Sequence, residues 1–123
     1  MYSVEEDRRT GIVRITTEGF WDVAAVDGLM EALRPIIGRI KASGRPLLMV
    51  NDARKFAVQS PEVRERFAQM GKMLGVRPDR LAIISTSTLF RLQGERTDRV
   101  DARYFATPEE ADAWLLKALQ PAR

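Results

Sequence analysis

The chain has 123 residues, of which 45% are hydrophobic and 30% are charged, a composition typical of one folded domain with a single core. Twenty basic and 17 acidic residues give a formal net charge of +3, and the sequence contains neither histidine nor cysteine. These two absences exclude Ser-His-Asp and Cys-His catalysis, disulfides, and the usual zinc and iron–sulfur sites.

The charged residues are intermixed along the chain, as in segments 62–66 and 95–99. Intermixed charges are typical of a solvated surface, whereas nucleic-acid binding requires lysine and arginine concentrated on one face. No apolar run approaches the roughly 20 residues of a membrane span, and the beginning MYSVEEDRR lacks the pattern of a signal peptide. We therefore expect a cytoplasmic protein with no nucleic-acid partner and no membrane span.

Two short runs rich in β-branched and aromatic residues, 1–6 and 11–17, are separated by the polar turn 7–11. They predict an antiparallel hairpin. In the second run Arg14 and Thr16 alternate with Val13 and Ile15, so one face of this strand is expected to be wetter than the other.

Segment 21–46 predicts a long amphipathic helix with Asp22 as its N-cap and Gly44 at its end. Pro35 lies inside the pattern, where it removes a backbone hydrogen bond, so we expect a kink or a break there. The apolar face of this helix is formed by Val26, Leu29, Met30, Leu33, Ile37 and Ile40.

Segments 46–50 and 81–85 are continuous apolar runs, which is typical of strands that are buried on both faces of a parallel sheet. Between them, a second helix is predicted by the spacing of four apolar residues and ends at Gly75. Its apolar residues are Val63, Phe67, Met70 and Leu74. A third, weaker helix is expected over about 87–98, and Gly94 within it favours a short or irregular one.

The segment 102–106 predicts a strand, and 107–119 predicts a capped amphipathic helix. Thr107 is the expected N-cap, with Pro108 at N1 and Glu110 completing a capping box. The buried stripe is predicted to comprise Ala111, Trp114, Leu115, Ala118 and Leu119. The whole chain, 1–123, is therefore expected to form one α/β domain of order β-β-α-β-α-β-α-β-α, a mixed sheet covered by helices.

Polar residues follow the two apolar strands, and ligands of open α/β sheets gather at the carboxyl ends of strands. Each candidate also has a simpler explanation. Asp52 and Arg54 can pair with each other, Ser60 followed by proline is an ordinary N-cap, and the serines of segment 85–88 can cap or turn instead of holding an anion. The candidate rim comprises Asn51, Asp52, Arg54, Ser60, Ser85, Ser87 and Arg91.

Catalysis by this chain would rest on carboxylates, lysine, serine or tyrosine. A paired-carboxylate mechanism needs two acids in one cleft, yet only Asp52 follows a buried strand. Asp79 and Asp101 come just before strands, at the opposite end of a parallel sheet. The glycine motifs that bind phosphates are also absent. We therefore expect no enzyme activity, no metal site and no cofactor.

Three groups of residues resemble the STAS-like proteins, single-domain relatives of bacterial anti-anti-sigma factors, over nearly the whole chain. The groups are Gly19-Phe20-Trp21, then Val50 to Arg54, and finally Arg103-Tyr104-Phe105 with Thr107 to Glu110, Ala111, Trp114 and Leu115. The resemblance implies a small α/β domain that binds protein partners and is switched by phosphorylation of a serine or threonine.

In that family the switch residue follows the strand that ends in Asp, and Ser60 is its positional counterpart here. The segment NDARKFAVQSPE departs from the family pattern, because it lacks the Asp-Ser-Ser-Gly-like signature. Phe20 and Trp21 form either an exposed contact patch or a lid on the core.

Two hypotheses of function follow. The first is a non-enzymatic, cytoplasmic STAS-like regulatory domain that binds a protein partner or itself as a homodimer. The second is a module that binds a small apolar or anionic ligand, or a lipid, at the strand carboxyl ends and in a cavity beneath the second helix. An enclosed apolar pocket favours the second hypothesis, and an exposed apolar patch favours the first.

Overall fold

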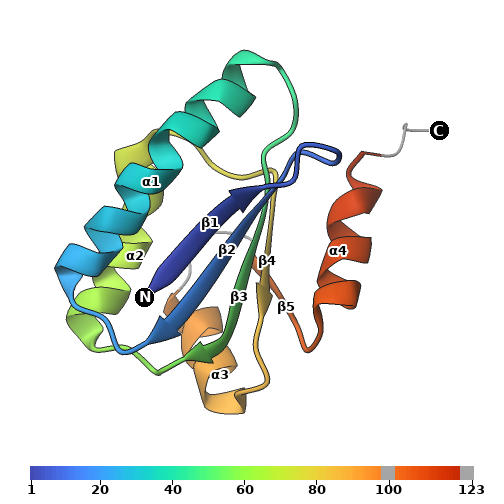
Figure 1. Cartoon of the computed structure of the whole chain (residues 1–123). Coiled ribbons are helices and arrows are strands. Elements are labelled where there is room, and N and C mark those ends of the chain that lie inside the picture. The colour runs from blue at the N-terminus through green and yellow to red at the C-terminus, as the bar shows by residue number, and fades with distance from the viewer. Residues whose placement is uncertain (98–101, 120–123) are drawn as a thin grey trace.

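The computed structural model describes residues 1–97 and 102–119 (Figure 1). Its strands are β1 (Tyr2–Glu6), β2 (Ile12–Gly19), β3 (Leu48–Phe56), β4 (Arg80–Ile84) and β5 (Ala102–Phe105). Its helices are α1 (Val23–Ala42), α2 (Pro61–Leu74), α3 (Thr88–Thr97) and α4 (Pro108–Lys117). This order confirms the predicted arrangement of elements; the last residue of the expected third helix, at position 98, lies outside the described residues.

The five strands form one sheet in the order β1-β2-β3-β4-β5. β1 runs antiparallel to β2, whereas β2, β3, β4 and β5 are mutually parallel, so the predicted hairpin and mixed sheet are both confirmed. The carboxyl ends of the four parallel strands therefore meet at one edge of the sheet (Figure 1).

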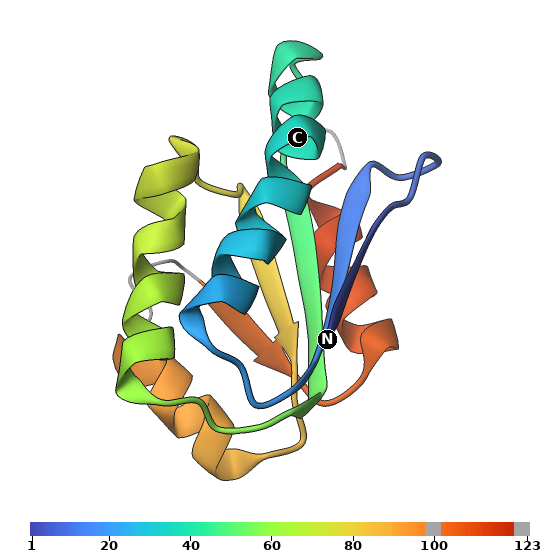
Figure 2. The same cartoon turned by 60° about the vertical axis from the view of Figure 1, so that its left-hand side comes forward.

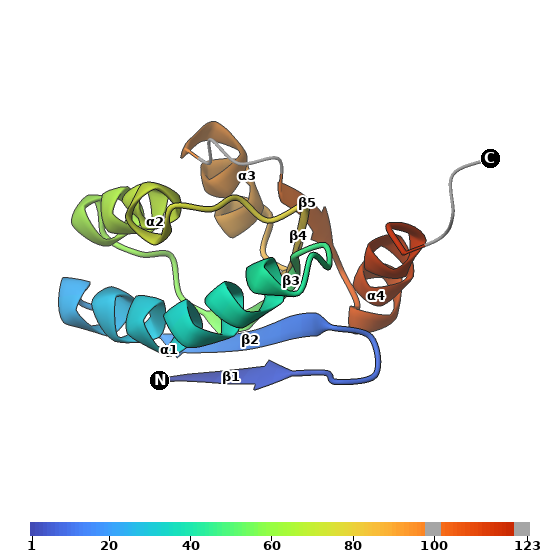
Figure 3. The same ribbon diagram turned by 90° about the horizontal axis from the view of Figure 1, so that it is seen from above.

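Helices cover both faces of the sheet. α1 and α2 lie side by side over one face (Figure 2), and Phe90 of α3 packs against the same core. α4 covers the opposite face, where Ala111 and Leu115 pack on β3 and β4 (Figure 3). The more polar face of β2 that the sequence predicts is on this side. There Arg14 forms a bidentate ion pair with Asp112 of α4, with Nη1–Oδ1 at 2.9 Å and Nη2–Oδ2 at 3.0 Å.

α1 begins at the predicted N-cap, where the Asp22 carboxylate accepts a hydrogen bond from the backbone N–H of Ala25 at 2.8 Å. All six residues of the predicted apolar face are buried. The predicted break at Pro35 is wrong, because α1 continues through it for 20 residues. Pro35 and Glu31 are both exposed, so water can solvate the Glu31 carbonyl that lacks a partner.

β3 extends beyond residue 50, where the sequence predicted that the strand would end and a loop would begin. Asn51, Asp52 and Arg54 lie inside the strand, which ends only at Phe56. The strand continues because β2 supplies backbone partners past the polar residues, and Gly19 still pairs with Phe56 after a register shift. Pairing with a neighbouring strand outweighs the low strand propensity of Asn and Asp.

The caps predicted for α2 and α4 are confirmed. Ser60 caps α2, which ends at Gly75 in the left-handed region with φ 73°. Thr107 caps α4, and its hydroxyl also donates to the Glu110 carboxylate at 3.0 Å. The buried stripe of α4 is shorter than predicted, because Leu119 lies beyond the end of the helix and is 44% exposed.

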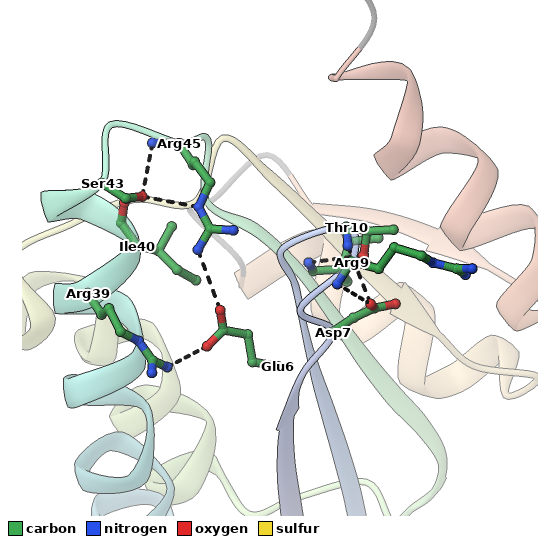
Figure 4. A network of polar contacts seen from close by, with 9 residues as sticks. Glu6, Asp7, Arg9, Thr10, Arg39, Ile40, Ser43 and Arg45 are labelled. Carbon is green, nitrogen blue, oxygen red and sulfur yellow. Dashed lines mark hydrogen bonds and ion pairs between the residues drawn. The ribbon is translucent and has the colours of Figure 1, made fainter.

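A polar network joins the hairpin to the end of α1 (Figure 4). The Glu6 carboxylate accepts hydrogen bonds from Arg39 and from Arg45, the latter at 3.5 Å. Asp7 caps the hairpin turn by accepting from the backbone N–H groups of Arg9 and Thr10.

Among the helices that the structure describes, none has the combination of length and apolar character needed to span a membrane.

Candidate functional site

The predicted rim residues on β3 divide between the two faces of the sheet. Asn51 lines a pocket on the side of α1 and α2. Side chains alternate along a strand, so Asp52 points to the opposite face, and Arg54 interacts electrostatically with Glu109 of α4. In contrast to the expectation of one shared rim, these three residues therefore do not lie together in one site. Neighbouring side chains of a strand point to opposite faces of the sheet, whereas a loop could have brought them together.

Asp52 and Arg54 form a bidentate ion pair, with Nε–Oδ1 at 2.9 Å and Nη2–Oδ2 at 2.6 Å. The hydrogen bond from Arg54 holds the pKa of the Asp52 carboxyl below its usual value, and partial burial opposes this effect. The pairing is the simpler of the two explanations that the sequence left open for these residues. Asp79 is engaged elsewhere, where it accepts from the Leu47 backbone N–H at 2.7 Å; Asp101 lies outside the described residues.

The serine hydroxyls of the predicted rim stabilise turns and helix ends. Ser60 accepts from the Val63 N–H at 3.2 Å, and Ser85 accepts from the Ser87 N–H at 3.2 Å. Ser87 in turn accepts from the Phe90 N–H at 3.1 Å, which caps α3. Arg91, one turn later, is exposed. These contacts account for the serines structurally, while an anion site there and phosphorylation of Ser60 stay predictions.

Sequence reasoning missed Gln59, which joins two of the loops at this edge of the sheet. Its side-chain oxygen accepts from the Trp21 N–H at 2.8 Å, and its nitrogen donates to the carbonyls of Gly19 and Ala57 at 2.9 and 2.6 Å. Gln59 is 6% exposed; its hydrogen bond with Trp21 is buried, and those with Gly19 and Ala57 are partly buried. A glutamine next to a predicted N-cap has no distinctive pattern, and only the tertiary structure identifies its role.

The two aromatic residues after β2 have different environments. Trp21 is buried and lies within 5.7 Å, between ring centroids, of Tyr2, Phe56 and Phe67. Phe20 is 69% exposed. Trp21 is therefore part of the core, as the lid alternative expects, whereas a contact role for the exposed Phe20 stays a prediction.

A pocket of about 210 Å³ lies beneath α2, where the sequence placed the cavity of the second hypothesis. Its floor is the sheet, α1 and α2 form its walls, and Phe90 of α3 and Phe56 of β3 contribute at the strand carboxyl ends. The sheet supplies Ile15, Met49, Asn51, Leu81, Ile83 and Tyr104. α2 supplies Arg64, Phe67, Ala68, Met70, Gly71 and Leu74.

The pocket exists because α2 packs mainly beside α1 and bears small residues over the sheet. Arg66 of α2 bonds Asp27 of α1 at 2.7 Å, which joins the two helices. Ala68 and Gly71 leave space on the pocket side of α2, and a Cβ atom added at Gly71 would meet nothing within 4 Å. Larger side chains at these positions would fill part of this volume.

Two polar groups on the pocket wall have spare hydrogen-bonding capacity. The Nε of Arg64 is buried and has no partner among the residues that the structure describes. Asn51 accepts from the Thr17 hydroxyl at 3.1 Å through its oxygen, which leaves the donors of its amide nitrogen. Arg64 was not among the predicted site residues. A signal for it is present in the sequence, because Arg64, Ala68 and Gly71 share one flank of the helix at spacings of four and three.

No protein-family model matches this chain, and no curated protein matches it. A solved structure is similar over nearly its whole length: an uncharacterised protein from the DUF3478 family with a SpoIIAA-like fold, from Shewanella loihica PV-4. The two align with a TM-score of 0.63 and 16% identity, covering 94% of this chain and 92% of that one. The chain therefore has a SpoIIAA-like fold, which confirms the STAS-like fold that the sequence predicts.

Proposed function

We propose that this protein binds a small, predominantly apolar molecule in the pocket beneath α2. The observation that supports this proposal is the lining, because 17 of its 21 residues are apolar and the other four are Asn51, Gln59, Arg64 and Tyr104. Ligand pockets combine apolar walls with a few polar groups in this way. An apolar cavity of about 150 Å³ is large enough for benzene, and this one measures about 210 Å³.

The proposed activity is binding without chemical conversion. The described lining contains no carboxylate, serine, threonine or lysine, so a nucleophile with an adjacent base has no counterpart on its walls. The rim serines serve as caps, and Asp52 is paired on the other side of the sheet. A role in holding or delivering a ligand fits this arrangement better than catalysis.

Titration with 1-octanol, followed by the methyl NMR signals of the lining residues Ile83 and Leu81, tests the proposal. We expect saturable shifts of these signals in the wild-type protein. Ala68→Leu should abolish them, because the larger side chain occupies the pocket. Gln69→Leu changes the exposed neighbour on the same helix and should bind as the wild type does. Unsaturable or absent shifts in the wild type would refute the proposal.

A regulatory protein-interaction role, the first hypothesis from the sequence, is the second candidate. It is favoured by Phe20, Leu89 and Leu92, which are 69%, 58% and 48% exposed. Phe20 follows the carboxyl end of β2, and the two leucines belong to α3, which follows the carboxyl end of β4. An exposed apolar patch of this kind is where a protein partner or a second copy of the chain would dock.

A further inference from the structure

Arg64 is the only charged side chain in the described lining of the pocket. Its Nε lies within the protein and has no hydrogen-bond partner among the described residues. A buried N–H without an acceptor costs free energy, and the cost is larger when the group is charged. An anionic ligand group that reaches this atom would remove that cost.

The polar and apolar parts of the pocket lie at opposite ends of α2. Arg64 is in the first turn of the helix, near the strand carboxyl ends where Gln59 also lies. Leu74 in the last turn, with Val76 and Pro78 beyond it, lines the far end. Arg64 and Leu74 are ten positions apart, which corresponds to about 15 Å along the helix. The pocket is therefore elongated along α2 and polar at one end.

The charge and size of the pocket restrict what its ligand can be. One guanidinium balances one negative charge, and two parallel N–H groups on one edge of it match the two oxygens of a carboxylate. The position of Arg64 in the first turn of α2 adds the positive end of the helix dipole. A volume of about 210 Å³ is smaller than the roughly 300–1,000 Å³ of pockets for drug-sized ligands, which favours one aliphatic chain over two.

We propose that the ligand is a single-chain aliphatic carboxylate whose head group is bound by Arg64 and whose tail extends along α2 toward Leu74. This inference rests on the proposed function, because it names the class of ligand for the same pocket. The amide nitrogen of Asn51, also on the pocket wall, is a second donor for the carboxylate.

Calorimetric titration with octanoate and 1-octanol at neutral pH tests the inference, since the two share a tail and differ in charge. The wild type should bind octanoate at least about tenfold more tightly, the effect of a hydrogen bond to a charged group. Arg64→Met should remove this preference and keep the affinity for 1-octanol, which also shows that the variant is folded. Lys72→Met, which removes an exposed positive charge from the same helix outside this pocket, should keep the preference.

The outcomes separate the two proposals. Equal affinity for octanoate and 1-octanol in the wild type would overturn the carboxylate assignment and leave apolar binding standing. Tighter binding of octyl phosphate than of octanoate would overturn it as well. Failure of all three compounds to bind would refute the proposed function together with this inference.

Discussion

The backbone N–H of Trp21 donates a hydrogen bond of 2.8 Å to the side-chain oxygen of Gln59, 38 residues later in the chain. The same side chain donates to the carbonyls of Gly19 and Ala57. One buried amide thus joins the loop between β2 and α1 to the loop between β3 and α2. Both helices that form walls of the pocket are positioned by this contact.

Gln59→Leu should lower the free energy of unfolding by about 1–3 kcal/mol. The substitution keeps the volume but leaves the buried Trp21 N–H without an acceptor, whereas the carbonyl of the exposed Ala57 can bond to water instead. Gln69→Leu on the exposed face of α2 is the control and should change stability by less than about 0.5 kcal/mol. Urea denaturation measures both, and equal midpoints for the two variants would contradict the role of Gln59.

The contact between α1 and α2 should weaken in acid. The hydrogen bond from Arg66 holds the pKa of the Asp27 carboxyl below its usual value of 3.8, against a smaller opposing effect of desolvation. Because the folded value is the lower one, the stabilisation is complete above the unfolded value of 3.8 and is lost as pH falls through the folded value. We therefore expect Asp27→Asn to destabilise the protein at neutral pH and to have progressively less effect below pH 3.8.

Urea denaturation of the wild type and of Asp27→Asn over this pH range measures the difference. In an Arg66→Met background, Asp27→Asn should no longer give a difference that depends on pH in this way. A difference in the wild-type background that stays constant below pH 3.8 would show that the ion pair is not its source.

Much of the fold could be predicted because the signals are local. The six buried residues of α1 recur at helical spacing, and Asp22, Ser60 and Thr107 cap helices whose first turns follow directly in the sequence. The extension of β3 past Asn51 could not be predicted this way, since it depends on pairing with β2, which lies more than 30 residues earlier.

The candidate site was predicted less well, for the same physical reason. A pocket is the volume that packed elements leave unfilled, so it depends on how α2 lies against α1 and on Ala68 and Gly71 together. Of the seven predicted rim residues, only Asn51 lines it. The sequence could place polar residues near a strand end but could not assign them to one face of the sheet until the end of β3 was known.

Ser60→Ala should cost about 1 kcal/mol of stability, because the Val63 N–H loses its acceptor. Ser60→Asp should cost less, since aspartate also caps and its charge is favourable at a helix N-terminus. Ser87→Ala, which removes the cap of α3, is a matched comparison. Thermal unfolding measures all three, and a Ser60→Asp variant less stable than Ser60→Ala would contradict the capping argument.

Phosphorylation of Ser60 is a separate prediction, which comes from the resemblance to STAS-like proteins. Intact-mass measurement of the protein from its own host should show the mass of one phosphate, which peptide mapping should assign to Ser60. Ser60→Asp should then alter partner binding or oligomeric state. The phosphorylation switch would be refuted if the protein from its own host lacks the added mass and Ser60→Asp changes neither partner binding nor oligomeric state.

The exposed apolar residues near the strand carboxyl ends predict self-association. Phe20 follows the carboxyl end of β2, and Leu89 lies in the first turn of α3, which follows the carboxyl end of β4. Burying one such side chain in an interface contributes about 1.5–3 kcal/mol, so the pair can support a weak homodimer. We expect sedimentation velocity to show a concentration-dependent dimer in the wild type.

The double variant Phe20→Ser and Leu89→Ser should be monomeric over the same range of concentration. Leu116→Ser is the control, because Leu116 is also exposed, at 38%, but lies on α4 over the opposite face of the sheet. A dimer that persists in the double variant and dissociates in Leu116→Ser would place the interface on α4. If the wild type stays monomeric, self-association is refuted, and Phe20 and Leu89 would instead contact a protein of different sequence. Binding of that protein should then depend on both residues.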